Sequence, residues 1–422
     1  MTTTTATLTD VIIIGAGQGG LQAAMSLRDH GYTGRLTIVG DEPGLPYQRP
    51  PLSKAYLIND DAMSEELLLL RPHSVFERLD IDLITGDGVT RIDRVRSTVS
   101  LSSGRELAFD HLILATGARP RELSVPGADL AGVEALRTCD DAKAIRAGLT
   151  GPARVVVIGG GFVGTEVAAA ATKRGHSVTI VDMEARLLNR AVSPEISALV
   201  TAAHRRRGTA VVLNAGVSRL CGSDGTVEAV ELTDGQRIPA DFVVVGIGVV
   251  PNTEIADDAG LAVDNGILVD DRLRTNDHRI SAIGDCARFP CAHADGQMLR
   301  LESVQNAVDH ARHVAARLMG DAGPYDAVPW FWTDQCGLKI QIAGIGAQGA
   351  ESVVIGDEAA ERCSVLRFRS GELSCVESVN SSGEHMAARK ILRGGPRPVA
   401  PVDGSPAAFD LKHIAREVAT AR

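Results

Sequence analysis

The spacing Gly-x-Gly-x-x-Gly occurs twice in this chain, within DVIIIGAGQGGLQAAMSL and within ARVVVIGGGFVGTEVAAAAT. The six glycines are Gly15, Gly17, Gly20, Gly159, Gly161 and Gly164. In such a motif the first glycine permits the turn, the second lets the backbone approach a pyrophosphate, and the third allows tight packing of helix on strand. The helix N-terminus then faces the phosphate charge. Each segment therefore predicts a phosphate-binding turn.

An acidic residue follows each motif at the distance expected for recognition of a ribose. Asp41 in RLTIVGDE and Asp182 in SVTIVDME each lie about 20 residues beyond the third glycine. A single glycine motif is weak evidence for nucleotide binding, because glycine turns after strands are common. Two copies, each with its acid, predict that the chain binds two dinucleotides.

A rigid basic segment, YQRPPLSKAYL, follows the first acid. Arg49 and Lys54 flank Pro50 and Pro51, and no cysteine occurs before Cys139. A nucleotide-binding unit alone has no obvious use for a stiff loop that carries a lysine, so this segment is a candidate for chemistry.

The elements that position these residues can be read from the surrounding pattern. Each glycine motif lies between an apolar β-branched run and helix-forming residues, which predicts strand, turn and helix. Two more strand-like segments, FDHLILATGARPR and ADFVVVGIGVVPN, lie before and after the second motif, and the first of them ends at Thr116 and Gly117. This order indicates that the second nucleotide-binding unit is inserted into the first. DDRLRTNDHRISAIGDCARF then returns a strand and an acidic turn to the first unit.

Length and composition are those of a globular protein of two or three domains. The chain has 422 residues, of which 44% are hydrophobic and 23% charged. Its net charge of −10 makes general nucleic-acid binding improbable, since that requires a basic face.

Seven scattered cysteines, without a C-x-x-C pair, favour reduced thiols and a cytoplasmic setting. Cys286 and Cys291 lack the partners of a zinc site, so we expect both to be buried and no metal to be bound. The N-terminal segment MTTTTATLTD has neither the charge nor the apolar stretch of a signal peptide, and no apolar run is long enough to span a membrane.

Taken together and in order, several segments resemble one known family. They are GAGQGG, RPPLSKAYL, ILATGARPR, LRTCDDA, GGGFVGTEVAA, GIGVVPN, IGDCARF, RLESVQNA and VPWFWTDQ. The family is that of the FAD-dependent NADH:ferredoxin reductases, which serve bacterial haem-thiolate monooxygenases and aromatic-ring dioxygenases within the glutathione-reductase-like superfamily. The resemblance covers nearly the whole chain.

The resemblance implies an α/β fold with two three-layer, Rossmann-like dinucleotide-binding domains and a C-terminal α+β domain. The NADH domain is inserted in the FAD domain. The expected boundaries are FAD domain 1–115 and 249–328, NADH domain 116–248 and C-terminal domain 329–422.

It also gives the basic loop a role. Disulfide reductases of this superfamily carry a cysteine pair near the flavin, whereas this chain has Pro50 to Lys54 there. Electrons are then expected to leave the flavin one at a time to an external carrier. In this family the residue matching Lys54 lies against the flavin ring and close to an acid, here Glu166. An ammonium there would stabilise the anionic reduced ring, and the carboxylate would hold the ammonium in place.

Further cofactor contacts follow from the resemblance by position. The expected contacts with FAD, beyond the first glycine motif, are Gly19, Asp41, Arg49, Lys54, Val89, Thr116, Gly117, Arg137, Asp285 and Val304. Asp182 and the second glycine motif are expected to bind NADH, and we expect NADH to be preferred over NADPH even though Arg186 lies four residues beyond Asp182. Trp332 matches a ring that borders the flavin near the docking surface of the partner, and Trp330 could share this role.

The implied activity is that of an NADH-dependent ferredoxin reductase: FAD takes a hydride from NADH and passes single electrons to a 2Fe–2S ferredoxin, which feeds an oxygenase. One alternative is an NADH oxidase, whose single reactive cysteine this loop lacks. The other is a redox-gated NADH-binding flavoprotein of the apoptosis-inducing-factor type. Because ferredoxins are acidic and this chain is too, docking would need a local basic patch, with candidates Arg71, Arg300, Arg389, Lys390 and Arg393.

Overall fold

The first glycine motif lies between strand β1 (Asp10–Ile14) and helix α1 (Gln18–Asp29). The computed structural model of the chain describes residues 8–58, 64–321, 323–347, 349–394, 398 and 409–420. They divide into two units. The first unit takes Met1–Gln48, Glu65–Arg119 and Val250–Ala327, and the second takes Arg49–Ser64, Pro120–Val249 and Val328–Arg422.

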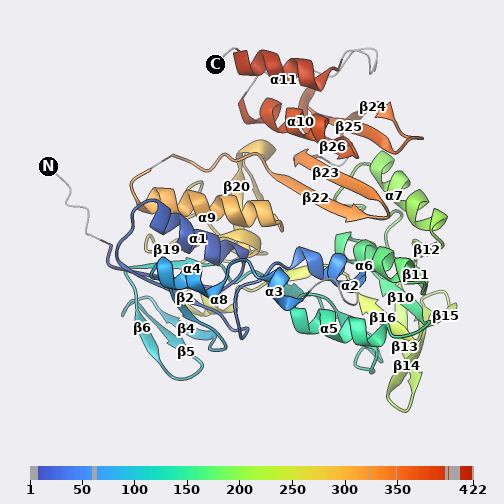
Figure 1. Ribbon diagram of the computed structural model, residues 1–422, viewed down its shortest axis with the longest axis horizontal. Coiled ribbons are helices and arrows are strands. Elements are labelled where there is room, and N and C mark those ends of the chain that lie inside the picture. Colours follow the sequence, from blue (N-terminus) through green and yellow to red (C-terminus); the bar gives the residue numbers. More distant parts are fainter. Residues whose placement is uncertain are drawn as a thin grey trace. The chain divides into compact units, whose positions relative to one another are not determined.

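A five-stranded parallel sheet organises the first unit. Its strands, in spatial order, are β19 (Ile280–Ala282), β7 (His111–Leu114), β1, β2 (Arg35–Val39) and β3 (Asp82–Ile84). Val11 to Ile14 are all buried, as expected for a strand covered on both faces. Helix α1 packs beside α9 (Val304–Leu318), as Figure 1 shows. Strand β19, which pairs with β7, confirms the strand that was expected to return the chain to this sheet after the second unit.

Smaller elements complete the first unit. They are α3 (Glu65–Leu68), α4 (His73–Arg78), β4 (Val89–Asp93), β5 (Thr98–Leu101), β6 (Glu106–Ala108), β8 (Ala118–Pro120), β17 (Val249–Pro251), α8 (Glu254–Asp258), β18 (Ile267–Leu268), η2 (Gly284–Cys286), β20 (Ala287–Cys291), η3 (Ala292–Ala294) and β21 (Gln297–Leu299). Strands β8 and β17 are where the chain passes into the second unit and back. Cys286 and Cys291 are buried, as the sequence predicts.

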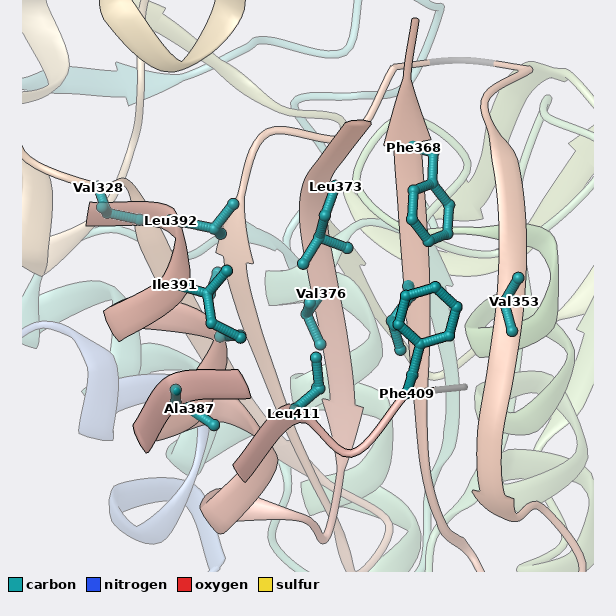
Figure 2. Packing of buried hydrophobic residues seen from close by; sticks show 14 residues of the cluster. Val328, Val353, Phe368, Leu373, Val376, Ala387, Ile391, Leu392, Phe409 and Leu411 are labelled. Atoms are coloured by element: carbon teal, nitrogen blue, oxygen red, sulfur yellow. The ribbon is translucent and has the colours of Figure 1, made fainter. Parts of the chain in front are cut away.

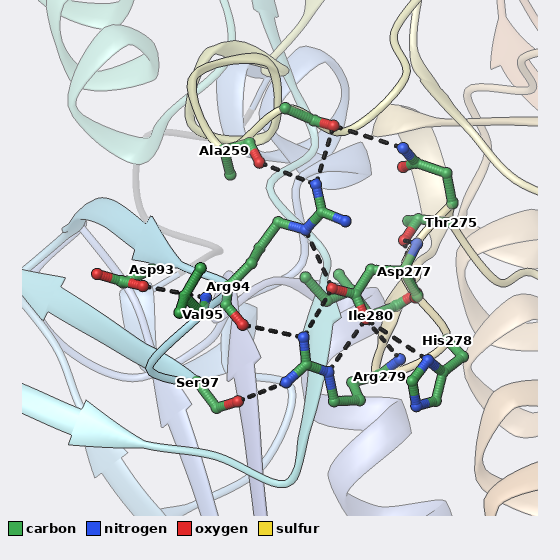
Figure 3. A network of polar contacts seen from close by, with 12 residues as sticks. Asp93, Arg94, Val95, Ser97, Ala259, Thr275, Asp277, His278, Arg279 and Ile280 are labelled. Atoms are coloured by element: carbon green, nitrogen blue, oxygen red, sulfur yellow. Dashed lines mark hydrogen bonds and ion pairs between the residues drawn. The ribbon is translucent and has the colours of Figure 1, made fainter.

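A buried carboxylate joins the hairpin of β4 and β5 to the loop before β19. Asp277 accepts hydrogen bonds from Arg94 Nε at 3.0 Å and from Arg279 Nη2 at 3.0 Å (Figure 3). Burial alone would raise the pKa of Asp277, but the two guanidinium groups outweigh it and hold that pKa well below its ordinary value. The network fixes two distant segments of the first unit to each other.

The second unit repeats the arrangement around another parallel sheet. Its strands, in spatial order, are β12 (Ala210–Val212), β11 (Ser177–Val181), β10 (Arg154–Ile158), β16 (Phe242–Val245) and β9 (Val133–Ala135). The other elements of this part are η1 (Pro50–Ser53), α2 (Ala55–Ile58), α5 (Cys139–Gly148), α6 (Phe162–Lys173), α7 (Pro194–Arg206), β13 (Val217–Ser223), β14 (Thr226–Leu232) and β15 (Arg237–Pro239). Strands β13, β14 and β15 form a separate antiparallel sheet. Its apolar side chains share one core with those of the parallel sheet, and this core includes Val156, Val181 and Val230.

The C-terminal part of the second unit is an antiparallel sheet covered by two helices. The strands, in spatial order, are β22 (Trp330–Gln335), β23 (Leu338–Gly344), β26 (Glu372–Val379), β25 (Arg362–Arg369) and β24 (Glu351–Asp357). Helices α10 (Ser382–Gly394) and α11 (Leu411–Thr420) lie on this sheet. Figure 2 shows Ile391 and Leu411 packed among Val376, Phe368 and Phe409.

The expected α/β fold, with two parallel-sheet nucleotide-binding parts and a C-terminal α+β part, is confirmed. None of the helices that the described residues form is both long and apolar enough to cross a membrane.

Candidate active site

The first glycine motif has the geometry of a phosphate cradle. Gly15 has a φ of +113°, and a Cβ atom added there would lie 2.1 Å from the carbonyl oxygen of Ala115. A Cβ atom on Gly20 would lie 1.9 Å from the carbonyl oxygen of Gly15, so helix and turn pack backbone on backbone. Among the described residues, and apart from Gly17 and its neighbours along the chain, no atom comes within 4 Å of a Cβ added to Gly17. That open space at the start of α1 fits a pyrophosphate.

The second motif repeats this geometry in the second unit. Gly159 has a φ of +107°, and Gly164 approaches the carbonyl oxygen of Gly159 so closely that a Cβ atom would lie 2.0 Å from it. For a Cβ added to Gly161, the nearest atom of the described residues other than its chain neighbours is the carbonyl oxygen of Gly246, at 3.9 Å. Helix α6 begins at the next residue, Phe162. Both cradles therefore fit a dinucleotide.

In the first unit, residues expected to contact FAD gather at the carboxyl ends of neighbouring parallel strands. Thr116 follows β7 and lies beside Gly15, 3.3 Å from the position of an added Cβ. Gly19 approaches Ala307 of α9, the helix that begins at Val304. Parallel α/β sheets bind ligands at this edge.

Backbone turns define the rest of this edge. Gly117 has a φ of +67°, and its carbonyl oxygen accepts the backbone N–H of Asn252 at 3.0 Å. Asp285 lies in η2, and its carbonyl oxygen accepts a hydrogen bond from Arg300 at 3.2 Å.

The acid of the first unit lies at the same edge. Asp41 is exposed beyond β2, and its Oδ1 accepts the backbone N–H of Glu42 at 3.0 Å. Its Cβ lies 3.2 Å from the position of a Cβ added to Gly88, the residue before Val89 at the start of β4. Asp41 and Val89 are thus neighbours, as adenosine recognition would need.

The acid of the second unit is held against its glycine loop. Asp182 Oδ2 accepts the backbone N–H of Gly160 at 2.5 Å, and Oδ1 accepts that of Glu184 at 2.9 Å. A side chain at Gly160 would collide with this carboxylate, since an added Cβ lies 2.5 Å from Oδ2. Gly160, the middle glycine of GGG, therefore has to lack a side chain so that the Asp182 carboxylate fits against the loop.

Lys54 and Glu166 form an ion pair, with Nζ 2.8 Å from Oε1. Lys54 ends the turn η1, which Pro50 and Pro51 begin, and Glu166 lies in the second turn of α6. The side chains are 19% and 5% exposed. The structure thus brings together the two residues that the resemblance paired.

Two hydroxyl groups complete the surroundings of this carboxylate. Ser53 Oγ donates to Glu166 Oε2 at 2.5 Å, and Thr333 Oγ1 donates to Oε1 at 2.5 Å. With Lys54, the carboxylate has three donors from two separate segments of the chain, the turn at Ser53 and Lys54 and strand β22. Sequence reasoning gave neither hydroxyl residue a role, and Thr333 reaches Glu166 only because the fold brings β22 against α6.

The hydrogen-bond chain continues away from the pair. Gln335 Nε2 donates to Thr333 Oγ1 at 3.2 Å, and its Oε1 lies 3.0 Å from Nε2 of His204 on α7. Burial lowers the pKa of His204, so the neutral imidazole donates to this oxygen. The pair is tied to both the C-terminal sheet and α7.

Strand β22 presents aromatic rings on both faces. Phe331 packs on Phe162 of α6, with ring centroids 4.4 Å apart. Trp330 and Trp332 project from the other face, 5.5 Å apart. The guanidinium of Arg389 lies over the Trp330 ring at 4.4 Å. Because side chains alternate between the two faces of β22, Thr333 points toward Glu166 and both tryptophans lie on the opposite face.

The remaining predicted contacts, Arg49 and Arg137, meet in the second unit. Arg49 Nη1 donates to the carbonyl oxygen of Arg137 at 2.8 Å. The backbone N–H groups of Arg137 and Thr138 donate to Asp141, which forms the capping box of α5. Arg49 thus anchors the basic loop to the start of α5.

The prediction is wrong for one residue of the basic docking patch. Arg300 was expected to contribute to a basic docking patch, but its side chain is 9% exposed and lies 2.6 Å from Glu302. Arg71, Lys390 and Arg393 are exposed. Within the residues that the structure describes, no group of three potential ligands could hold a metal ion.

The model of the pyridine nucleotide-disulphide oxidoreductase family matches residues 9–311, and a reductase C-terminal model matches residues 330–415. The chain belongs to this oxidoreductase family. Rhodocoxin reductase of Rhodococcus erythropolis is 49% identical over 402 residues, covering 95% of this chain and 93% of that protein. Putidaredoxin reductase CamA of Pseudomonas putida is 39% identical over 391 residues, covering 91% of each.

Two solved structures agree over almost the full length. The ferredoxin reductase for the CYP199A2 system of Rhodopseudomonas palustris has a TM-score of 0.92 and 44% identity, covering 96% of this chain and 99% of that one. The reductase in the covalent putidaredoxin reductase–putidaredoxin complex has a TM-score of 0.91 and 39% identity, covering 97% and 99%. The recognition of the family from sequence motifs is confirmed.

Proposed function

We propose that this chain is an NADH-dependent reductase of a 2Fe–2S ferredoxin that feeds an oxygenase. One NADH and two oxidised ferredoxins give NAD⁺, one proton and two reduced ferredoxins. Bound FAD supplies the chemistry that connects a two-electron donor with one-electron acceptors. The chain's own residues bind and orient the two nucleotides and set the charge beside the flavin.

The observation that carries this proposal is the Lys54–Glu166 pair in a family named for disulphide chemistry. The stiff turn at Pro50 and Pro51 carries a lysine, and no cysteine precedes Cys139. Without a thiol relay, a one-electron carrier is the natural acceptor. The relatives named as reductases of rhodocoxin and putidaredoxin support this choice.

The residues divide by role. Lys54 would stabilise negative charge on the reduced ring, Glu166 would hold Lys54, and Trp332 would border the ring on the partner side. FAD would be held by the first glycine motif with Gly19, Asp41, Arg49, Val89, Thr116, Gly117, Arg137, Asp285 and Val304. NADH would be held by the second motif and Asp182. This assigns FAD binding to 1–115 and 249–328 and NADH binding to 116–248, and leaves 329–422 as the C-terminal α+β domain that carries Trp332.

The proposed location is the cytoplasm, where thiols stay reduced. All seven cysteines are free in the structure, and five of them are buried. Cell fractionation with an antibody against the chain tests this, and recovery in an oxidising compartment would contradict it.

The test of function is an anaerobic coupled assay. Purified protein loaded with FAD should reduce putidaredoxin, used as a probe 2Fe–2S protein, with NADH as donor. It should not reduce glutathione disulfide, used as a probe disulfide, at a comparable rate. Fast disulfide reduction with no reduction of iron–sulfur proteins would overturn the proposal.

A further inference from the structure

Asp182 is followed by a loop, residues 183–193, that leads into α7 and that we call the acid loop. Arg186 lies in it, four residues beyond the acid, where a cation could attract a 2′-phosphate. Its guanidinium is occupied instead. Nη1 donates to the carbonyl oxygens of Val192 at 2.9 Å and Ser193 at 3.3 Å, and Nη2 donates to that of Asn189 at 2.8 Å. The loop thus folds around its own arginine.

The far end of the acid loop is held by a carboxylate of the C-terminal sheet. Glu377 of β26 is fully buried, and its two oxygens accept the backbone N–H of Ser193 at 2.9 and 3.1 Å. Ser193 is also the N-cap of α7. Arg367 of β25 donates to the same carboxylate at 2.9 Å and is itself only 9% exposed. A buried ion pair therefore acts on one peptide group of the loop.

The near end of the loop is tied to the acid itself. Asn189 Nδ2 donates to Glu184 Oε2 at 2.7 Å, and the backbone N–H of Glu184 donates to Asp182. Leu188 has a φ of +54°, a conformation that costs a leucine energy. Its N–H donates to the carbonyl oxygen of Gly160 at 2.8 Å. This strained backbone persists because the contacts on both sides determine it.

We propose that Glu377 is a positioning residue for the dinucleotide: by holding Ser193 it keeps the acid loop closed around Arg186, which leaves Asp182 as the charge that meets the ribose. This inference rests on the proposed function and deepens it. A buried ion pair of the C-terminal domain then enforces the preference for NADH.

Release of Arg186 is sterically feasible. The acid loop and α7 line a cavity of about 560 Å³, with Arg186 on its wall beside Ala185, Ser197 and Leu213. If the carbonyl oxygens of Val192 and Ser193 moved away, the guanidinium could turn into this space. A guanidinium no longer held by the carbonyl oxygens of the loop, four residues beyond Asp182, would partly offset the like charge that a 2′-phosphate meets at this acid, since arginine recognises phosphate well.

The chain offers a matched control on the same helix. Glu361, at the end of the loop before β25, forms an ion pair with Arg206 in the last turn of α7. It joins the same C-terminal sheet to the same helix, far along the helix from the acid loop. Glu361→Gln therefore loosens α7 without touching Ser193.

The experiment compares Glu377→Gln, Glu361→Gln, Arg186→Lys and the double variant Glu377→Gln with Arg186→Gln. Specificity constants for NADH and NADPH are measured with ferricyanide as acceptor, and dissociation constants for NAD⁺ and NADP⁺ are measured by calorimetry. Glu377→Gln should lower the NADH-to-NADPH ratio of specificity constants by about tenfold, mainly through KM. Glu361→Gln should change this ratio by no more than about twofold. The double variant should use NADPH no better than the unaltered protein, because the arginine that would attract the 2′-phosphate is gone.

Arg186→Lys keeps the charge but cannot serve three carbonyl oxygens from a planar fork, so it should shift the ratio in the same direction as Glu377→Gln. This variant decides the matter if Glu377→Gln does not fold. An unchanged ratio in folded Glu377→Gln or in Arg186→Lys, or an equal change in Glu361→Gln, would overturn the inference. Failure of the proposed function is separate, because it would be seen as absence of ferredoxin reduction in the unaltered protein.

Discussion

Thr333 donates its hydroxyl hydrogen to the buried carboxylate of Glu166 across 2.5 Å, from a strand that begins 164 residues further along the chain than Glu166. The same carboxylate holds Lys54. The charge beside the proposed flavin site thus depends on a residue of the C-terminal sheet. Substitution of Lys54 should show the effect of the charge, and substitution of Glu166 or Thr333 should show the effect of holding that charge in position.

Removal of the ammonium should affect the flavin directly. Lys54→Ala should make the FAD potential more negative by roughly 20–60 mV, which corresponds to about 1–3 kcal/mol for a two-electron couple. It should also slow hydride transfer in stopped-flow traces, with little effect on NAD⁺ affinity. Glu166→Ala should perturb the same step, and the double variant should be non-additive. An unchanged potential and rate would make Lys54 an ordinary loop residue.

Removal of a hydroxyl donor should have a smaller effect of the same kind. Thr333→Val keeps the side-chain shape and removes one hydrogen bond to a charged group, so hydride transfer should slow by up to about tenfold. The control is Thr172→Val, on the same helix α6 as Glu166, which loses a hydroxyl contact with Thr209 instead. Equal rates for the two variants would show that Thr333 does not position Glu166.

Coenzyme choice should depend on the carboxylate at residue 182. Asp182→Asn keeps an oxygen acceptor for Gly160 but removes the charge that opposes a 2′-phosphate, so the NADH-to-NADPH ratio of specificity constants should fall by about tenfold or more. Asp224→Asn, in the turn between β13 and β14, serves as the control. A ratio unaffected by Asp182→Asn would contradict the assignment.

Docking of the ferredoxin should show a local electrostatic component. Lys390→Glu should raise the apparent KM for ferredoxin, while NADH-to-ferricyanide activity stays unchanged, and raised salt should have the same effect. Arg389→Glu should have a larger effect because it also removes the guanidinium from the Trp330 ring. Lys143→Glu reverses an exposed charge on α5 and is the control. No salt dependence would point to apolar docking around Trp332.

Buried imidazoles should make the protein less stable in acid. Burial lowers the pKa values of His111 and His310 to about 3 each. Unfolding exposes them at their ordinary pKa, about 6.5, so the unfolded chain binds more protons below that pH. Their contribution to stability is complete above pH 6.5 and is lost as the pH falls toward 3.

The measurement is the midpoint of thermal unfolding between pH 7 and pH 4. The midpoint should fall with pH, and His111→Gln should flatten the fall, whereas His73→Gln, at an exposed position, should not. A fall that is identical in His111→Gln and in the unaltered protein would show that His111 does not contribute to the acid sensitivity.

Local patterns predicted the nucleotide-binding parts because their glycines answer to backbone geometry within a few residues. Gly15 and Gly159 need positive φ, and Gly20 and Gly164 need contact with the turn before them. These constraints are recorded in the sequence itself. The strand that returns to the first sheet after the insertion was also predictable, from its own apolar run.

The surroundings of Glu166 could not be predicted in the same way. Thr333 reaches it only because β22 pairs with β23 in a register that turns Phe331 and Thr333 to one face. The role of Glu377 likewise depends on contact between β26 and α7, which are far apart in sequence. The wrong prediction for Arg300 has the same cause, since the burial of its side chain beside Glu302 follows from the fold and not from its charge.

In the proposed reaction the two electrons from one NADH leave singly, each to an iron–sulfur protein. The most direct test of this reaction is an anaerobic titration in which NADH is added in steps to the FAD-loaded protein with excess oxidised 2Fe–2S ferredoxin, across a panel that includes putidaredoxin. Two reduced ferredoxins are expected per NADH, followed by visible absorbance and by the iron–sulfur signal in electron paramagnetic resonance. Oxidation of NADH that reduces the flavin but no member of the panel would contradict it.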